Sequence, residues 1–162
     1  LYSRKKRIQT NRATKSISRK KMPYYKIRNK GSSAKQTAWK NFSDYIRIRD
    51  CLKTTGSEDY CKCVTCGEIV PYEEIQAGHA IAGRTNGILF DESIVRGQCS
   101  RCNCGGGGET QAFKAVLVAE HGAEWYEMKK QARKNSAFLT DDQYRLISKY
   151  FLKKRKELQN KA

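Results

Sequence analysis

The sequence predicts an α+β protein in which helices and short strands surround a metal site, preceded by a basic arm. Three observations support this. Two Cys-x-x-Cys motifs have the spacing of metal-binding turns, the segment between them has the composition of two short strands around a turn, and the flanking segments repeat apolar residues at helical spacing. The length of 162 residues suits one domain with an appended arm.

Positive charge is concentrated at the start of the chain, and we expect residues 1–33 to form a flexible basic arm. Residues 1–40 hold fourteen Lys and Arg and no acidic residue, whereas the other 122 residues hold nineteen basic and sixteen acidic residues. A solvated tail is the simpler reading, but so dense a block of charge favours a polyanion, because binding releases counterions from phosphate. DNA is the expected partner, although such an arm does not distinguish DNA from RNA. Contacts to the phosphate backbone are predicted for Arg4, Lys5, Lys6, Arg7, Arg19, Lys20 and Lys21.

The domain proper is predicted to begin with a helix over residues 34–53. Trp39, Phe42 and Ile46 follow the three-and-four spacing of a buried helical face, and the segment "TTGSED" ends the pattern. Residues 74–96 are expected to form two short strands around the turn-rich "AGRTNG", because Asn-Gly is a strong hairpin signal.

Three further helices are predicted after the second Cys-x-x-Cys motif, the first in "ETQAFKAVLVAEHG" and the second in "AEWYEMKKQARKN". The last has a well-marked start: Thr140 as N-cap, Asp141 and Asp142 in the first turn, and Gln143 in the capping-box position. No apolar run approaches the ~20 residues needed to span a membrane.

Four cysteines are predicted to hold a structural zinc ion. Two Cys-x-x-Cys turns, 32 residues apart, can supply the four tetrahedral thiolate ligands that zinc prefers. The chain shows no secretory signal and has an odd number of cysteines, seven, which favours metal binding in a reducing compartment over disulfides. Cys61 and Cys104 are possible substitutes two residues from a motif cysteine. The predicted ligands are Cys63, Cys66, Cys99 and Cys102.

The residues around these motifs suggest chemistry as well as folding. His79 is placed on the first predicted strand, and a neutral imidazole can accept a proton from water near pH 7. Asn103 directly follows the second motif and offers an amide oxygen suited to a hard cation. Arg84 and Arg96 can hold phosphate oxygens through forked hydrogen bonds. We interpret the chain's other histidine, His121, as a residue at a helix end.

A histidine on a strand, followed by a Cys-x-x-Cys that closes on an Asn, resembles the ββα-metal or HNH nuclease motif. The wider order is similar to the phage NinG family, also called Rap. It comprises a basic arm, "WKNFSDYIRIRD", "AGH" with a nearby Arg, "LFDESIVRGQCSRCN", a glycine loop and a long basic C-terminal helix. The resemblance implies a zinc-stapled ββα-metal core with flanking helices, occupying residues 34–162.

The resemblance also implies a function and its residues. His79 would be the general base, Asn103 would hold Mg²⁺ or Mn²⁺, Arg84 would contact phosphate, and the zinc would lie outside the active site. The activity would be a metal-dependent, structure-selective cleavage of branched recombination intermediates such as Holliday junctions or D-loops. Two cuts suggest a homodimer, and a phage protein of this kind is expected in the cytoplasm of the bacterial host.

Two positions depart from the HNH pattern and leave alternatives open. Gly78 stands where many HNH enzymes have a metal-binding acid or His, and Ile94 stands where many have an Asn. The cation would then rest on Asn103 with water and phosphate, or borrow Asp91 or Glu92. The rival functions are a general HNH nickase or endonuclease and a non-catalytic zinc-ribbon DNA-binding protein.

Overall fold

A computed structural model describes residues 32–105, 108–135 and 137–161 and confirms a mixed α+β architecture. Along the described chain the elements are α1 (Ser33–Thr55), β1 (Tyr60–Lys62), β2 (Ile69–Pro71), a 3-10 turn (Tyr72–Glu74), β3 (Ile75–His79), β4 (Val95–Cys99), α2 (Ser100–Cys104), α3 (Thr110–His121), α4 (Ala123–Ala132) and α5 (Asp141–Gln159). The predicted arm lies almost wholly outside the described residues. The phosphate contacts proposed for Arg4, Lys5, Lys6, Arg7, Arg19, Lys20 and Lys21 therefore remain predictions.

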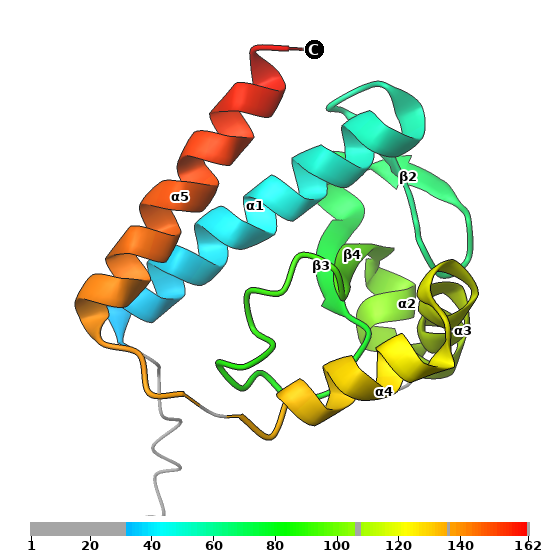
Figure 1. Ribbon diagram of the computed structural model, residues 1–162. Coiled ribbons are helices and arrows are strands. Elements are labelled where there is room, and N and C mark those ends of the chain that lie inside the picture. Colours follow the sequence, from blue (N-terminus) through cyan, green and yellow to red (C-terminus); the bar gives the residue numbers. More distant parts are fainter. Residues whose placement is uncertain (1–31, 106–107, 136, 162) are drawn as a thin grey trace, which may run out of the picture.

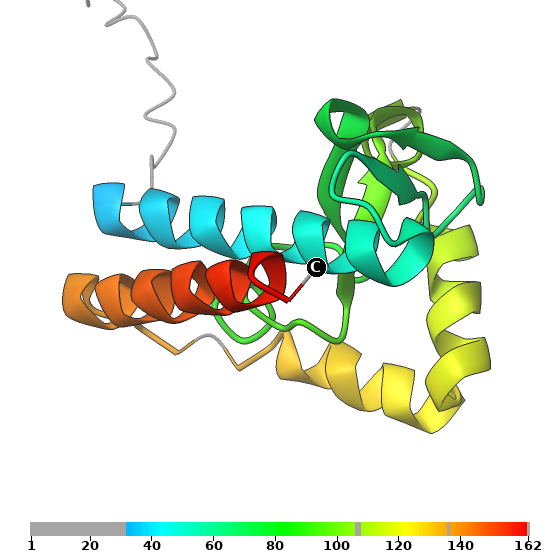
Figure 2. The same cartoon turned by 90° about the horizontal axis from the view of Figure 1, so that it is seen from above.

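Helices α1 and α5 lie side by side and run in the same direction (Figures 1 and 2). The Ser32 hydroxyl caps α1 by accepting the Lys35 N–H, and Gly56 ends it in the left-handed conformation that glycine adopts readily. Phe42 and Ile46 are fully buried, as the spacing predicted, and Trp39 is half-buried. The rings of Phe42 and Phe151 pack edge to face, with their centroids 4.7 Å apart.

The start of α5 confirms the predicted capping box. The Thr140 hydroxyl accepts the Gln143 N–H, and the Gln143 side chain accepts the Thr140 N–H at 2.8 Å. Asp141 and Asp142 occupy the first turn, where acidic groups favour the helix dipole. Local sequence therefore determines where this helix begins.

The strands form two separate antiparallel pairs, β1 with β2 and β3 with β4. The first strand predicted within residues 74–96 is confirmed, but its partner β4 begins only at Val95 and lies mostly beyond this range. The expected tight turn at Asn86-Gly87 is wrong, because a long loop joins β3 to β4. Asn86 instead accepts the Tyr144 hydroxyl at 2.9 Å and donates to the Ala137 carbonyl at 2.8 Å. A Cβ atom on Gly87 would lie 2.3 Å from the Ala132 carbonyl oxygen, so glycine is needed for close contact rather than for a turn.

The β3–β4 pair has one face toward α1 and the other beside α2. In its register Ala77 pairs with Gly97, and His79 pairs with Val95. These residues share the face toward α1, because successive side chains of a strand alternate. The opposite face carries Gln76, Gly78, Arg96 and Gln98, beside α2.

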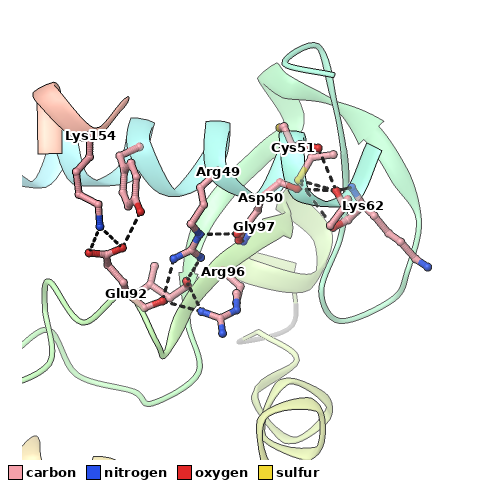
Figure 3. Close-up of polar contacts among 12 residues, drawn as sticks. Arg49, Asp50, Cys51, Lys62, Glu92, Arg96, Gly97 and Lys154 are labelled. Atoms are coloured by element: carbon pink, nitrogen blue, oxygen red, sulfur yellow. Dashed lines mark hydrogen bonds and ion pairs between the residues drawn. The ribbon is translucent and has the colours of Figure 1, made fainter. Parts of the chain in front are cut away.

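A polar network links α1 to β4, and Lys154 of α5 to Glu92 in the loop before β4 (Figure 3). Asp50, only 5% exposed, accepts the Gly97 N–H at 2.7 Å. Arg49 donates to the carbonyls of Glu92 and Val95 at 3.0 Å each.

Among the helices of the described ranges, none combines the length and the apolar character that crossing a bilayer requires.

Candidate functional site

The four predicted cysteines converge on one point, confirming their expected grouping as a possible metal site. The turn after β1 supplies Cys63 and Cys66, the end of β4 supplies Cys99, and α2 supplies Cys102. Their sulfur atoms all lie within 4.8 Å of one another. The Cys66 and Cys99 sulfurs are 3.9 Å apart, close to the edge of about 3.8 Å expected for a tetrahedron with zinc–sulfur bonds of about 2.3 Å.

Hydrogen bonds within the cluster favour a thiolate at Cys63. Burial acts to raise the pKa of this thiol, but backbone N–H groups of Cys66, Cys99 and Thr65 lower it to about 7. Burial raises the pKa of Cys102 to about 12, so this thiol depends on a metal ion to lose its proton. The donor set therefore fits a thiophilic cation such as zinc better than a hard cation.

The two substitute cysteines lie outside the cluster. Cys61 is buried beside Cys51, and a hydrogen bond between the two raises the pKa of Cys51. Cys104 is exposed and contacts the Gln76 amide oxygen at 3.3 Å. The spacing of the two motifs thus selected the right four cysteines.

His79 is the last residue of β3 and faces α1. Its ring stacks on Trp39 with centroids 5.2 Å apart, and its Nε2 lies 3.2 Å from the Leu89 carbonyl oxygen. A carbonyl can only accept, so Nε2 carries the proton and Nδ1 is left as the proton acceptor. Burial lowers the pKa of His79 to about 4, which keeps the ring neutral at physiological pH.

Arg84 lies near His79 through a shared aromatic partner. The exposed Arg84 places its guanidinium carbon 4.1 Å from the Trp39 ring, on which His79 also stacks. The Arg84 charge helps, to a minor extent, to keep the pKa of His79 low. A proton acceptor and a free cation are therefore grouped around Trp39.

Asn103 is held on the other face of β3. Its amide nitrogen donates to Gln76 at 2.6 Å, and Gln76 belongs to the face opposite His79. The structure therefore brings His79 together with Arg84 but does not place either in contact with Asn103.

Gln98 is a further polar residue at this place that the motif reading missed. A Cβ atom on Gly78 would lie 2.0 Å from the Gln98 Oε1 and 3.1 Å from the Asn103 Oδ1. Gln98 is only 3% exposed, and its amide nitrogen donates to the Thr65 hydroxyl at 2.6 Å. Gly78 thus leaves room for two amide oxygens where a side chain would otherwise stand. Gln-Cys at the start of the second motif was the available signal.

The two acids considered as additional cation ligands are engaged elsewhere. Asp91 pairs with Lys129 at 2.8 Å and accepts hydrogen bonds from Ser93; burial acts to raise its pKa, but these partners lower it. Glu92 pairs with Lys154 at 2.8 Å and accepts the Tyr45 hydroxyl. Neither acid has a recorded contact with Asn103 in the described parts of the chain. Ile94 is fully buried in the core.

Arg96 also has structural partners. Its side chain is 16% exposed, donates to the Glu92 carbonyl at 2.6 Å and lies 3.7 Å from the Glu120 carboxylate (Figure 3 shows the first contact). Its role in DNA binding remains a prediction.

Comparison with known proteins supplies a family. The sequence model of the family described as "Bacteriophage Lambda NinG protein" matches residues 2–161. No curated protein and no solved structure matches the chain. Because the match spans nearly the full sequence, the chain belongs to the NinG family.

Proposed function

We propose that this NinG-family protein is a metal-dependent endonuclease that cleaves branched DNA, such as Holliday junctions or D-loops. The observation that carries the proposal is the state of His79. Its ring is neutral, its Nε2 is bound to a carbonyl, and its neighbour Arg84 is exposed and cationic. A neutral ring with an unprotonated Nδ1 can accept a proton, and the adjacent cation can bind a phosphate, although a pKa of about 4 lies below the value near 7 at which a general base is most effective.

The chain's own residues would divide the reaction as follows. His79 Nδ1 would take a proton from the water that attacks phosphorus, while Arg84 would hold a phosphate oxygen by charge-assisted hydrogen bonds. The four thiolates would hold a structural zinc that fixes the first cysteine turn against β4 and α2.

A hard divalent cation, Mg²⁺ or Mn²⁺, would be held by Asn103, with Gln98 beside it. Both residues present amide oxygens near Gly78, and such oxygens are suitable ligands for either ion. When bound, the cation would stabilise the negative charge of the leaving oxygen. The two amides are neutral, so water and substrate phosphate would complete the coordination.

The preference for branched DNA and the two-copy assembly rest on the family resemblance and on the need for two cuts. A homodimer would place two sites on one junction, and a DNA substrate of this kind would be met in the host cytoplasm. The basic arm would add contacts that do not depend on base sequence.

A second candidate is a non-catalytic zinc protein that binds DNA. The observation that favours it is the placement of His79 and Asn103 on opposite faces of β3. In that case His79 is a core residue held by Trp39 and the Leu89 carbonyl. A general HNH nuclease, the third alternative, differs only in lacking a preference for junctions.

The test is cleavage of a labelled four-way junction beside a linear duplex of the same sequence, with Mg²⁺, Mn²⁺ or chelator. His79→Ala is compared with His121→Ala, a matched control at the last residue of α3, whose ring packs at a tilt against Trp125. The proposal expects metal-dependent junction cutting that is lost only in His79→Ala. Equal cutting of both substrates would indicate a general nuclease, and binding without cutting would favour the DNA-binding module.

A further inference from the structure

We propose that a cavity between residues 80–82, α3 and α4 binds a backbone phosphate of the DNA. The cavity, hereafter the α3–α4 pocket, has a volume of about 230 Å³ and is lined by three cationic side chains, Lys114, Lys130 and Arg133. The inference rests on the proposed function only in taking DNA as the partner. It assigns a phosphate subsite that does not depend on His79 being catalytic.

The charges of the α3–α4 pocket lack partners inside it. No acidic residue is among those that line it. Within the described ranges, Lys114 and Arg133 form no ion pair. Lys130 is paired with Glu127 at 3.3 Å, but both side chains are more than half exposed, so this pair is weak. Clustered cations without counter-charges repel one another and favour an anion between them.

The surroundings hold these cations in place before any ligand binds. The Lys114 ammonium lies 5.2 Å from the Tyr126 ring centroid, and the Tyr126 hydroxyl donates to the Ala80 carbonyl at 3.1 Å. Arg133 crosses Gly83, where a Cβ atom would lie 2.8 Å from its Nε. Gly83 also has a φ of 97°, a backbone angle that residues other than glycine rarely adopt. Lys114 is thus held beside an aromatic ring, and the glycine leaves room for Arg133 to lie across the loop.

The first turn of α3 adds a separate favourable contribution. Thr110 and Gln111 belong to the pocket wall. The Thr110 N–H is bound to the Gly108 carbonyl at 3.0 Å, but the next N–H groups of the first turn have no partner within the helix. The N-cap residue, Glu109, makes no side-chain capping bond to them. These N–H groups and the positive end of the helix dipole both favour an anion.

The α3–α4 pocket lies next to the proposed active site along the chain. Its wall begins at Ala80, the residue after His79, and the same loop continues to the exposed Arg84. One DNA molecule could therefore contact both places, and the phosphate contact in the pocket does not require cleavage at His79.

The test is the salt dependence of DNA affinity, measured by fluorescence anisotropy over a KCl series without divalent cations. Lys114→Gln and Arg133→Gln are compared with Lys149→Gln, a matched loss of one exposed charge on α5. Losing one phosphate contact to duplex DNA lowers the slope of log K against log salt by about 0.9, equivalent to about 8-fold in affinity at 0.1 M salt. We expect this change in both pocket variants and an unchanged slope in Lys149→Gln. Thermal melting checks that each variant is folded.

Two results would overturn the inference. One is a wild-type slope in both pocket variants, or an equal loss in Lys149→Gln. The other combines two observations: inorganic phosphate, at constant ionic strength, raises the thermal stability of the wild type but not of Arg133→Gln, and the salt slopes of DNA affinity do not differ between the two proteins. That result would identify a site for free phosphate. This assay measures binding alone. If the pocket variants have a smaller salt slope but the wild type never cleaves DNA, the nuclease proposal is refuted and the phosphate site in the pocket is supported.

Discussion

The half-buried His79 ring predicts a specific loss of stability in acid. Burial lowers its pKa in the folded protein to about 4, against an ordinary value of 6.5. Folding therefore favours the neutral ring: the stabilisation is complete above pH 6.5 and disappears as the pH falls toward 4. These two values give a loss of about 3 kcal/mol between pH 7 and pH 4 that is due to this residue alone.

The measurement is urea unfolding of the wild type and His79→Asn at several pH values between 7 and 4, with zinc present. Protonation of the cysteine ligands also destabilises the protein in acid, but it affects both proteins alike and cancels in their difference. That difference should shrink by about 3 kcal/mol as the pH falls. If the two curves were parallel, the pKa of His79 would be the same in the folded and unfolded protein, and the ring would be solvated rather than buried.

Three further predictions concern folding and the metal site. Cys66→Ser should release zinc and lower the melting temperature, whereas Cys104→Ser should retain zinc, as a colorimetric zinc assay would show; equal retention would place the metal elsewhere. Gly78→Ala should cost about 1–3 kcal/mol through overpacking, and a double-mutant cycle with Gln98→Ala should recover part of that cost; no coupling would mean that Gln98 is not what the new methyl group meets. Asp50→Ala should destabilise the fold by about 3 kcal/mol in urea unfolding, because it leaves buried donors without their acceptor, and a neutral result would show that water replaces the carboxylate.

Much of the fold could be predicted because its signals are local. Thr140 and Gln143 cap α5 through groups three residues apart, so no distant contact is needed to place the helix start. The grouping of the four cysteines could also be predicted from the sequence. Each Cys-x-x-Cys turn directs its two sulfurs to one point, and a shared metal ion requires the two points to coincide.

Long-range packing limited the rest. Asn86-Gly87 has the composition of a hairpin turn, but its contacts are with Tyr144 and with the segment after α4, far along the chain. Tertiary contacts therefore override the local preference, and the loop is drawn away from β3 and β4.

The sequence could not predict the face of the sheet on which each candidate side chain lies, because this too depends on long-range packing. A motif gives the order of His79 and Asn103, but the register of β3 with β4 decides the face of His79, and a shift of one residue would move it to the other face. Asn103 depends in addition on the docking of α2. Gly78 carries no side chain, and the amide oxygens of Gln98 and Asn103 lie where its Cβ atom would stand, on the face opposite His79. Cleavage by the proposed mechanism would therefore require one DNA phosphate to be reached from both faces of β3.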